Sequence, residues 1–147
     1  KNCFLNYLKQ DYLFLIQFSK AWSLAVLKSD NLDEMKISAS TVNDLINFEM
    51  QLHIDLCDEY GISKKDLEST DERNENIAYT RYVLEAGYSG GFLDLIVSLL
   101  PCVIGYGEIG KNIGFFAFSA CECERSLVQP NPSSAVLLFA NNKNPQY

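Results

Sequence analysis

Basic residues are scarce in this chain of 147 residues. Its 12 Lys and Arg stand against 19 Asp and Glu, which gives a net charge of −7. A surface that binds nucleic acid must neutralise phosphates, so this balance argues against a nucleic-acid partner. The longest strongly apolar run, Phe92 to Ile104, is interrupted by Asp94, Ser98 and Pro101 and is shorter than the ~20 residues that cross a bilayer. We therefore expect no membrane span.

The N-terminal residues lack the features of a secretory signal. The opening Lys1 to Phe4 has neither a basic region followed by an apolar one nor a cleavage site, and no Met precedes it. We expect this end to be internal to a longer chain. The five cysteines are an odd number, and Cys3, Cys57 and Cys102 lie in helix-like apolar runs. This pattern favours reduced thiols and a cytoplasmic protein over a disulfide scaffold.

Candidate metal ligands are too few for a site. Cys121 and Cys123 could supply two soft ligands, but a structural site needs about four, and the single histidine, His53, lies far away in sequence. Glu49 and His53 are four residues apart on an apolar face, yet di-iron bundles use a repeated Glu-x-x-His motif. We expect no metal and interpret Glu49 and His53 as a structural pair.

What the chain does have is helical periodicity and enough apolar residues, 48%, for one domain with a buried core. Apolar positions recur every three or four residues in several segments, which predicts an all-α fold. Gly61 suits the end of a helix, and Ser63 with Asp66 forms an approximate capping box. Beyond Gly114 no periodicity is evident. The predicted helices run from Phe4 to Leu27, from about Ser40 to Tyr60, from about Asn76 to Ala86 and from about Phe92 to Asn112, with Gly87, Gly90 and Gly91 in the turn before the last.

Polar groups on apolar helical faces mark candidate functional residues, because burying them without partners is costly. Asp11 shares a face with Leu8 and Leu15, so it needs either a structural partner on a neighbouring helix or a ligand. Cys102 and Tyr106 are four residues apart and lie one above the other on a helix. Their spacing suits a nucleophile with a hydrogen-bonding neighbour, although a free Cys also serves as a small buried apolar residue.

Three stretches of this chain resemble the Cys-containing class of the TenA/thiaminase II family. The third carries the most specific motif, Leu-Pro-Cys followed by Gly-Tyr-x-Glu-Ile-Gly. The order and spacing of all three agree with the family over about residues 5 to 113. The stretches are Gln10 to Phe14, Ala78 to Tyr82 and Leu99 to Gly110.

The resemblance implies an all-α, haem-oxygenase-like helical bundle, usually a homotetramer, that works without metal or organic cofactor. It implies hydrolysis of aminopyrimidines in thiamine salvage. By position, Cys102 matches the family's nucleophile, and Asp11 matches the carboxylate that binds the amino edge of the pyrimidine. Tyr79 and Tyr106 match phenols that orient substrate, water and thiol. Phe14 stands where the family usually has Tyr, so ring stacking is expected to remain while a hydroxyl contact is lost.

The chain also departs from the family pattern. The family has a further helix before the part that matches, and several after Gly110, one of which carries a glutamate that acts as acid on the ring nitrogen. Glu122 and Glu124 lie in no such motif, so no catalytic glutamate is assigned. We expect a partial TenA-like domain over residues 1–113 and a divergent tail over 114–147. Two other functions remain open: a non-catalytic relative that binds pyrimidines or has a structural or regulatory role, and a helical interaction module without a pocket.

Overall fold

The computed structural model describes residues 2–120, and within this range the regular structure is helical, with no β-strand. The predicted all-α fold is therefore confirmed for the part of the chain that the structure describes. The chain divides into two compact units, Lys1–Ser98 and Leu99–Tyr147, and the last helix runs from the first into the second. The elements are α1 (Asn2–Lys28), α2 (Leu32–Asp44), the π-helical turn η1 (Leu45–Glu49), α3 (Met50–Glu59), α4 (Lys64–Glu68), α5 (Asn74–Ser89) and α6 (Phe92–Ala120).

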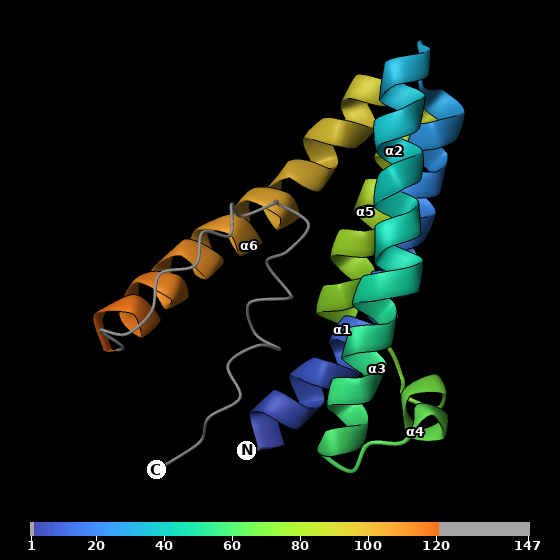
Figure 1. Cartoon of the computed structure of the whole chain (residues 1–147). Helices are drawn as coiled ribbons and strands as arrows, with labels where there is room; N and C mark the ends of the chain where they lie inside the picture. Colours follow the sequence, from blue (N-terminus) through green and yellow to red (C-terminus); the bar gives the residue numbers. More distant parts are fainter. Residues whose placement is uncertain (1, 121–147) are drawn as a thin grey trace. The chain divides into compact units, whose positions relative to one another are not determined.

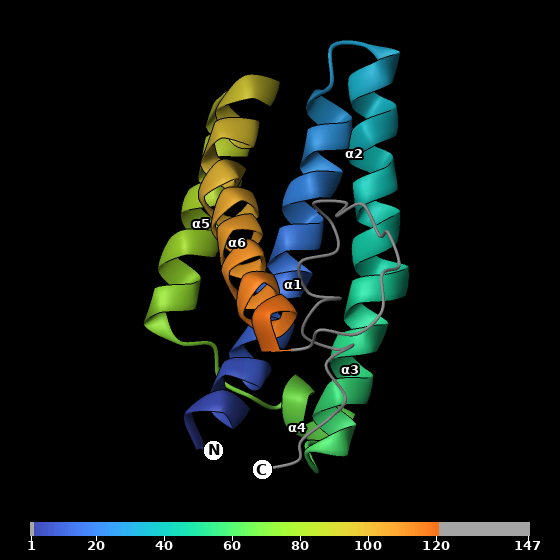
Figure 2. The ribbon, with the colours of Figure 1, turned by 60° about the vertical axis from the view of Figure 1, so that its left-hand side comes forward.

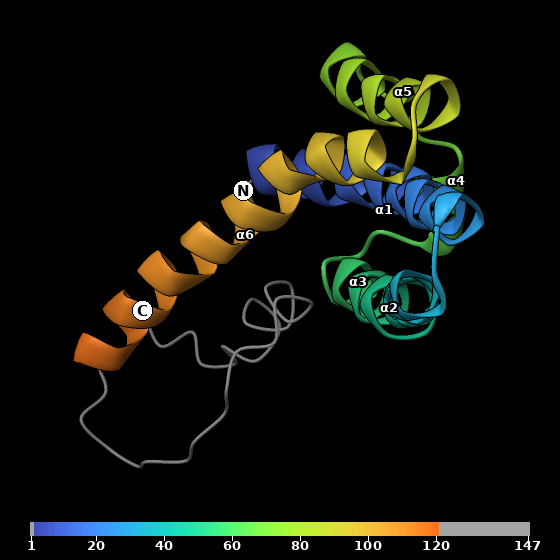
Figure 3. The same ribbon diagram turned by 90° about the horizontal axis from the view of Figure 1, so that it is seen from above.

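Helix α1 is the central element of the first unit. It packs against α5 on one side and against α2, η1 and α3 on the other, as Figures 1 and 2 show. Seen from above, α1 lies between α5 and the α2–α3 pair (Figure 3). One face of α1 supplies Leu8, Leu15 and Ala25 to the core, each at most 3% exposed. The apolar residues of α1 recur at helical spacing because they form the face that is buried in this core.

Local signals in the sequence account for most helix ends. Gly61 has φ +76° after α3, in the left-handed region that glycine adopts readily. Ser63 and Asp66 form the predicted capping box, in which each side chain accepts a hydrogen bond from the other residue's main-chain N–H. The long first helix and the short capped helix are thus confirmed.

Two predicted boundaries are wrong. The second helix begins at Leu32 rather than near Ser40, because the Asn31 side chain caps it by accepting from the main-chain N–H groups of Asp33 and Glu34. Gly87 does not lie in a turn. It is buried inside α5, and the turn that follows the helix is formed by Gly90 and Gly91.

Helix α6 also corrects the interpretation of the apolar run. Asp94, Ser98 and Pro101 do not interrupt it: Asp94 accepts from the main-chain N–H of Gly91 in the first turn, and Ser98 donates its hydroxyl to the Leu95 carbonyl. Within the described residues, Phe92–Ile109 is long and apolar enough to cross a membrane, with a mean hydropathy of 1.7. Core helices of water-soluble proteins can be equally long and apolar. Length and composition therefore do not show whether this segment is a core helix or a membrane span.

Candidate active site

Asp11 is a buried carboxylate with a partner on a neighbouring helix. It is 8% exposed, and one of its oxygens, Oδ2, lies 3.5 Å from Nδ1 of His53 on α3. The other ring nitrogen of His53, Nε2, lies 2.7 Å from the main-chain oxygen of Leu8, one turn before Asp11 on α1. His53 therefore contacts one turn of α1 at two points, a main-chain oxygen and a side-chain carboxylate.

The electrostatic neighbourhood of Asp11 includes two further titratable groups. Burial, together with the negative charges of Asp11 and Asp44, raises the pKa of Glu49 to about 7. Burial and Asp11 together raise the pKa of the Cys57 thiol to about 11. Cys57 is fully buried in the core cluster with Leu8 and stays protonated near neutral pH, so it is not a candidate nucleophile.

Sequence reasoning placed Glu49 and His53 together as a structural pair and did not connect them to Asp11. The structure brings His53 to Asp11 and places Glu49 at the end of the π-helical turn η1. A π-turn adds a residue to the helical repeat and is common at functional sites, but no particular residue type predicts it from the sequence. The signal that could have been used was the coincidence of three buried polar residues on two helices that must pack together.

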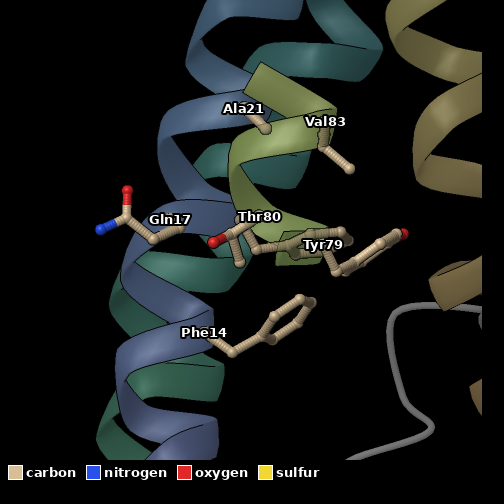
Figure 4. A pocket seen from close by; sticks show the side chains of 7 residues that line it. Phe14, Gln17, Ala21, Tyr79, Thr80 and Val83 are labelled. Carbon is tan, nitrogen blue, oxygen red and sulfur yellow. The ribbon is translucent and has the colours of Figure 1, made fainter. Parts of the chain in front are cut away.

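Aromatic rings line the next part of α1. The ring of Phe14 stacks on that of Tyr79 from α5, with centroids 6.2 Å apart and planes 15° from parallel, and Phe18 stacks on Phe14 at 5.1 Å. Figure 4 shows the Phe14 and Tyr79 rings facing each other between α1 and α5. The Tyr79 hydroxyl donates to the Ser98 carbonyl at 3.1 Å. The hollow beside the rings measures about 10 Å³, which is close to the space that one water molecule needs.

Cys102 and Tyr106 lie in the second unit, on α6, and both are half-buried. Their spacing of four residues in a continuous helix places them on one face, as predicted. Asp11 and Tyr79 belong to the first unit and Cys102 and Tyr106 to the second, and the structure describes each unit separately. That the four residues converge on one pocket stays a prediction. Helix α6 continues to Ala120, and most of the predicted tail, with Cys121, Glu122, Cys123 and Glu124, lies outside the described residues.

Comparison with known proteins gives a consistent family assignment. Residues 1–120 match the sequence model of the TENA/THI-4/PQQC family. The aminopyrimidine aminohydrolase of Halalkalibacterium halodurans is 37% identical over 113 residues, which are 77% of this chain and 50% of that protein. The protein of the same name from Helicobacter pylori is 31% identical over 110 residues, which are 75% of this chain and 51% of its own length. The chain thus spans about half the length of these curated relatives.

A solved structure resembles the fold. The crystal structure of a TenA family transcription regulator from Silicibacter superposes with a TM-score of 0.77 at 47% sequence identity. The match covers 95% of this chain and 63% of that protein. This similarity confirms the expected haem-oxygenase-like helical fold.

Proposed function

The chain belongs to the TENA/THI-4/PQQC family, and from this premise we propose that the protein hydrolyses aminopyrimidines in thiamine salvage. The substrate would be an aminomethylpyrimidine, which is converted to the hydroxymethyl compound with release of ammonia; cleavage of thiamine itself would be a second reaction of the same kind. Two relatives that carry the name aminopyrimidine aminohydrolase support this assignment. The proposal concerns the whole protein, of which this chain corresponds to about half in those relatives.

The observation that carries the proposal is the arrangement of Asp11, Phe14 and Tyr79 in the first unit. Asp11 and Phe14 are three residues apart on α1, so they lie on one face of that helix, and Tyr79 of α5 stacks on Phe14. A carboxylate about one helical turn along α1 from two nearly parallel aromatic rings suits a flat heterocycle with an exocyclic amine. The carboxylate would accept charge-assisted hydrogen bonds from the amino group, and the rings would stack on the pyrimidine.

The present ring spacing bears on how a substrate would enter. A planar ring held between two others needs about 7 Å between them, twice the ~3.5 Å contact distance of carbon atoms. The Phe14 and Tyr79 centroids are 6.2 Å apart, and the hollow beside them holds about one water molecule. We therefore expect Tyr79 or Phe14 to change its side-chain rotamer when the pyrimidine binds. Either the distance between the two rings increases by about 1 Å, so that the pyrimidine fits between them, or one ring turns so that the pyrimidine stacks on its free face.

The proposed chemistry uses Cys102 as nucleophile. Protonation of a ring nitrogen makes a pyrimidine carbon electrophilic, and the thiolate adds to it. The amine takes up a proton and leaves the methylene group as ammonia with the bonding electrons. Water then adds to the methylene carbon and loses a proton, and the thiolate departs to restore the ring. A thiolate suits both steps because it attacks well and leaves well. Tyr106, one turn after Cys102 on α6, would orient the thiol and the water. No metal or organic cofactor is needed for these steps.

We further propose that the protein is cytoplasmic and that its complete form is a homotetramer, as the family resemblance implies. A non-catalytic relative that binds pyrimidines is the second candidate. It is favoured by one observation: Phe14 replaces the family's usual Tyr, which removes a hydroxyl from the binding site while it leaves a ring for stacking.

The test is an assay of ammonia release from an aminomethylpyrimidine by the full-length protein and by its Cys102→Ser variant. We expect turnover in the wild type and none above background in the variant, with the same melting temperature, because the exchange is nearly isosteric but removes the nucleophile. Retention of near-normal turnover by Cys102→Ser would reject Cys102 as nucleophile. A thermal shift with the pyrimidine but no turnover in either protein would favour the non-catalytic candidate.

A further inference from the structure

The contacts of His53 restrict where its protons lie. The Nε2 atom is 2.7 Å from the Leu8 carbonyl oxygen, which can only accept a hydrogen bond. A short contact of this kind requires a hydrogen on Nε2. If the ring were neutral, Nδ1 would then carry a lone pair, and this lone pair would face the Asp11 carboxylate oxygen at 3.5 Å. Two electron-rich atoms would oppose each other in a buried place, where charge interactions are strong.

A second proton on Nδ1 removes this conflict. It turns the lone-pair contact into an ion pair between an imidazolium and the Asp11 carboxylate oxygen 3.5 Å from Nδ1, while Nε2 donates to the Leu8 carbonyl. His53 is 2% exposed and Asp11 is 8% exposed, so solvent screens this pair little. The imidazole ring is also hydrogen-bonded to the main-chain oxygen of Leu8, whose position is fixed by helix α1. His53 therefore holds the Asp11 side chain in a defined orientation relative to the main chain of α1.

We propose that His53 is a positioning residue that carries a proton on each ring nitrogen and holds the Asp11 carboxylate in the orientation that binds the substrate's amino group. The role of Asp11 in this statement rests on the proposed function. The proton on each nitrogen does not, because it follows from the contacts with Leu8 and Asp11 alone.

Two titratable groups near the pair are compatible with this charge state. They are Glu49 from η1, whose pKa is raised to about 7, and Cys57 from α3, whose pKa is raised to about 11. Below about pH 7 both groups are neutral, so neither brings a charge that disturbs the ion pair. Above pH 7 the ionised Glu49 would favour the imidazolium further.

The first experiment is nitrogen NMR of the imidazole. His53 is the one histidine of these 147 residues. After labelling with ¹⁵N-histidine, its two ring signals are identified as those that disappear in the His53→Gln variant. At pH 7 we expect both nitrogens of the wild-type protein to show protonated shifts with attached hydrogens. In the Asp11→Asn variant we expect Nε2 to keep its hydrogen and Nδ1 to lose it. A bare Nδ1 in the wild type, or the same protonation state in both proteins, would overturn the proposal.

The second experiment compares two substitutions of His53 that each keep one donor. The amide of asparagine lies near the position of Nδ1 and can still donate to Asp11, while the amide of glutamine lies near Nε2 and can still donate to Leu8. We expect His53→Gln to raise KM for the aminopyrimidine about tenfold or more, the usual effect of losing a hydrogen bond to a charged group. We expect His53→Asn to leave KM within about twofold of the wild type while lowering thermal stability.

Equal rises of KM in both variants would show that His53 acts through the fold alone and would reject the positioning role. The two experiments also separate this proposal from the proposed function. If the wild-type protein releases no ammonia, the proposed function fails, and the nitrogen shifts of the wild type and of Asp11→Asn still decide whether His53 holds both protons.

Discussion

A Cβ atom added to Gly87 would lie 2.6 Å from Cδ2 of Leu24. This close approach of α5 to α1 brings Tyr79 to the ring of Phe14, because Tyr79 and Gly87 belong to the same helix. A second neighbour, Leu95 at the start of α6, lies 3.0 Å from the same position. Helices α1, α5 and the first turns of α6 therefore meet where only a residue without a side chain fits.

The first prediction concerns this contact. Gly87→Ala should destabilise the fold by about 1–3 kcal/mol, since overpacking forces neighbouring side chains from their rotamers. The measurement is urea unfolding followed by circular dichroism. Gly105→Ala is the matched control, because a Cβ there meets nothing within 4 Å among the described residues; it should be neutral or stabilise α6 by up to ~1 kcal/mol. Equal effects of both exchanges would contradict the packing argument.

The second prediction concerns the start of α2. Asn31→Ala should lower the free energy of unfolding by about 1 kcal/mol, because two main-chain N–H groups lose their acceptor. The side chain of Asn31 accepts from Asp33 and Glu34 at 3.1 and 3.0 Å. Asn31→Asp keeps the acceptor and should be close to the wild type in the same urea titration. A wild-type midpoint for Asn31→Ala would show that the cap contributes nothing.

The helices were predictable where local chemistry defines them. The periodicity of α1, the glycine at φ +76° after α3 and the capping box at Ser63 each act within a few residues, so the sequence contains the whole cause. The start of α2 was missed although Asn31 is a good N-cap, because the first turns of α2 are largely exposed and lack an apolar stripe. Gly87 was taken for a turn because its packing against α1 depends on tertiary structure.

The site was predictable only in part, for the same reason. Asp11, Phe14 and Tyr79 were identified from their positions in family-like stretches and from the cost of burying a carboxylate. The contact between Asp11 and His53 was not, because it depends on how α1 and α3 pack and on the π-helical turn before α3. The relation of Cys102 and Tyr106 to the first unit stays a prediction.

The third prediction concerns the pH dependence of stability that Glu49 causes. Its pKa is raised from 4.5 to about 7 in the folded protein, so the folded state holds this proton more tightly than the unfolded state does. The stabilising contribution is therefore complete below pH 4.5 and is lost as the pH rises to about 7. The loss should amount to roughly 2–3 kcal/mol.

Glu49→Gln tests this assignment because glutamine keeps the shape but cannot ionise. Urea titrations between about pH 5 and 8.5 should show a flatter pH profile for the variant, with its largest gain over the wild type above pH 7. The same exchange at the exposed Glu85 is the control and should leave the profile unchanged. Parallel profiles of Glu49→Gln and wild type would mean that Glu49 ionises without cost to the fold.

The last prediction concerns the ring of Phe14, which stacks between Phe18 and Tyr79. If the pyrimidine binds against this ring, Phe14→Leu should weaken its affinity about 2- to 10-fold, since aromatic pairs contribute about 0.5–1.5 kcal/mol beyond their buried area. Phe14→Tyr keeps the ring and adds the hydroxyl that the family usually has at this position. It should bind at least as tightly as the wild type. Affinity is measured by calorimetry with an aminopyrimidine, which does not require turnover.

Phe4→Leu provides the matched control for this prediction. Phe4 lies at the other end of α1 and contacts Tyr7 and Tyr60, so the same loss of a ring there should leave the affinity unchanged. Melting temperatures of all variants separate lost binding from lost folding. If Phe14→Leu and Phe4→Leu bind the pyrimidine equally well, the ligand does not stack on Phe14. The site would then have to be sought away from the Asp11 face of α1, because Phe14 is the aromatic residue one turn after Asp11 on that face.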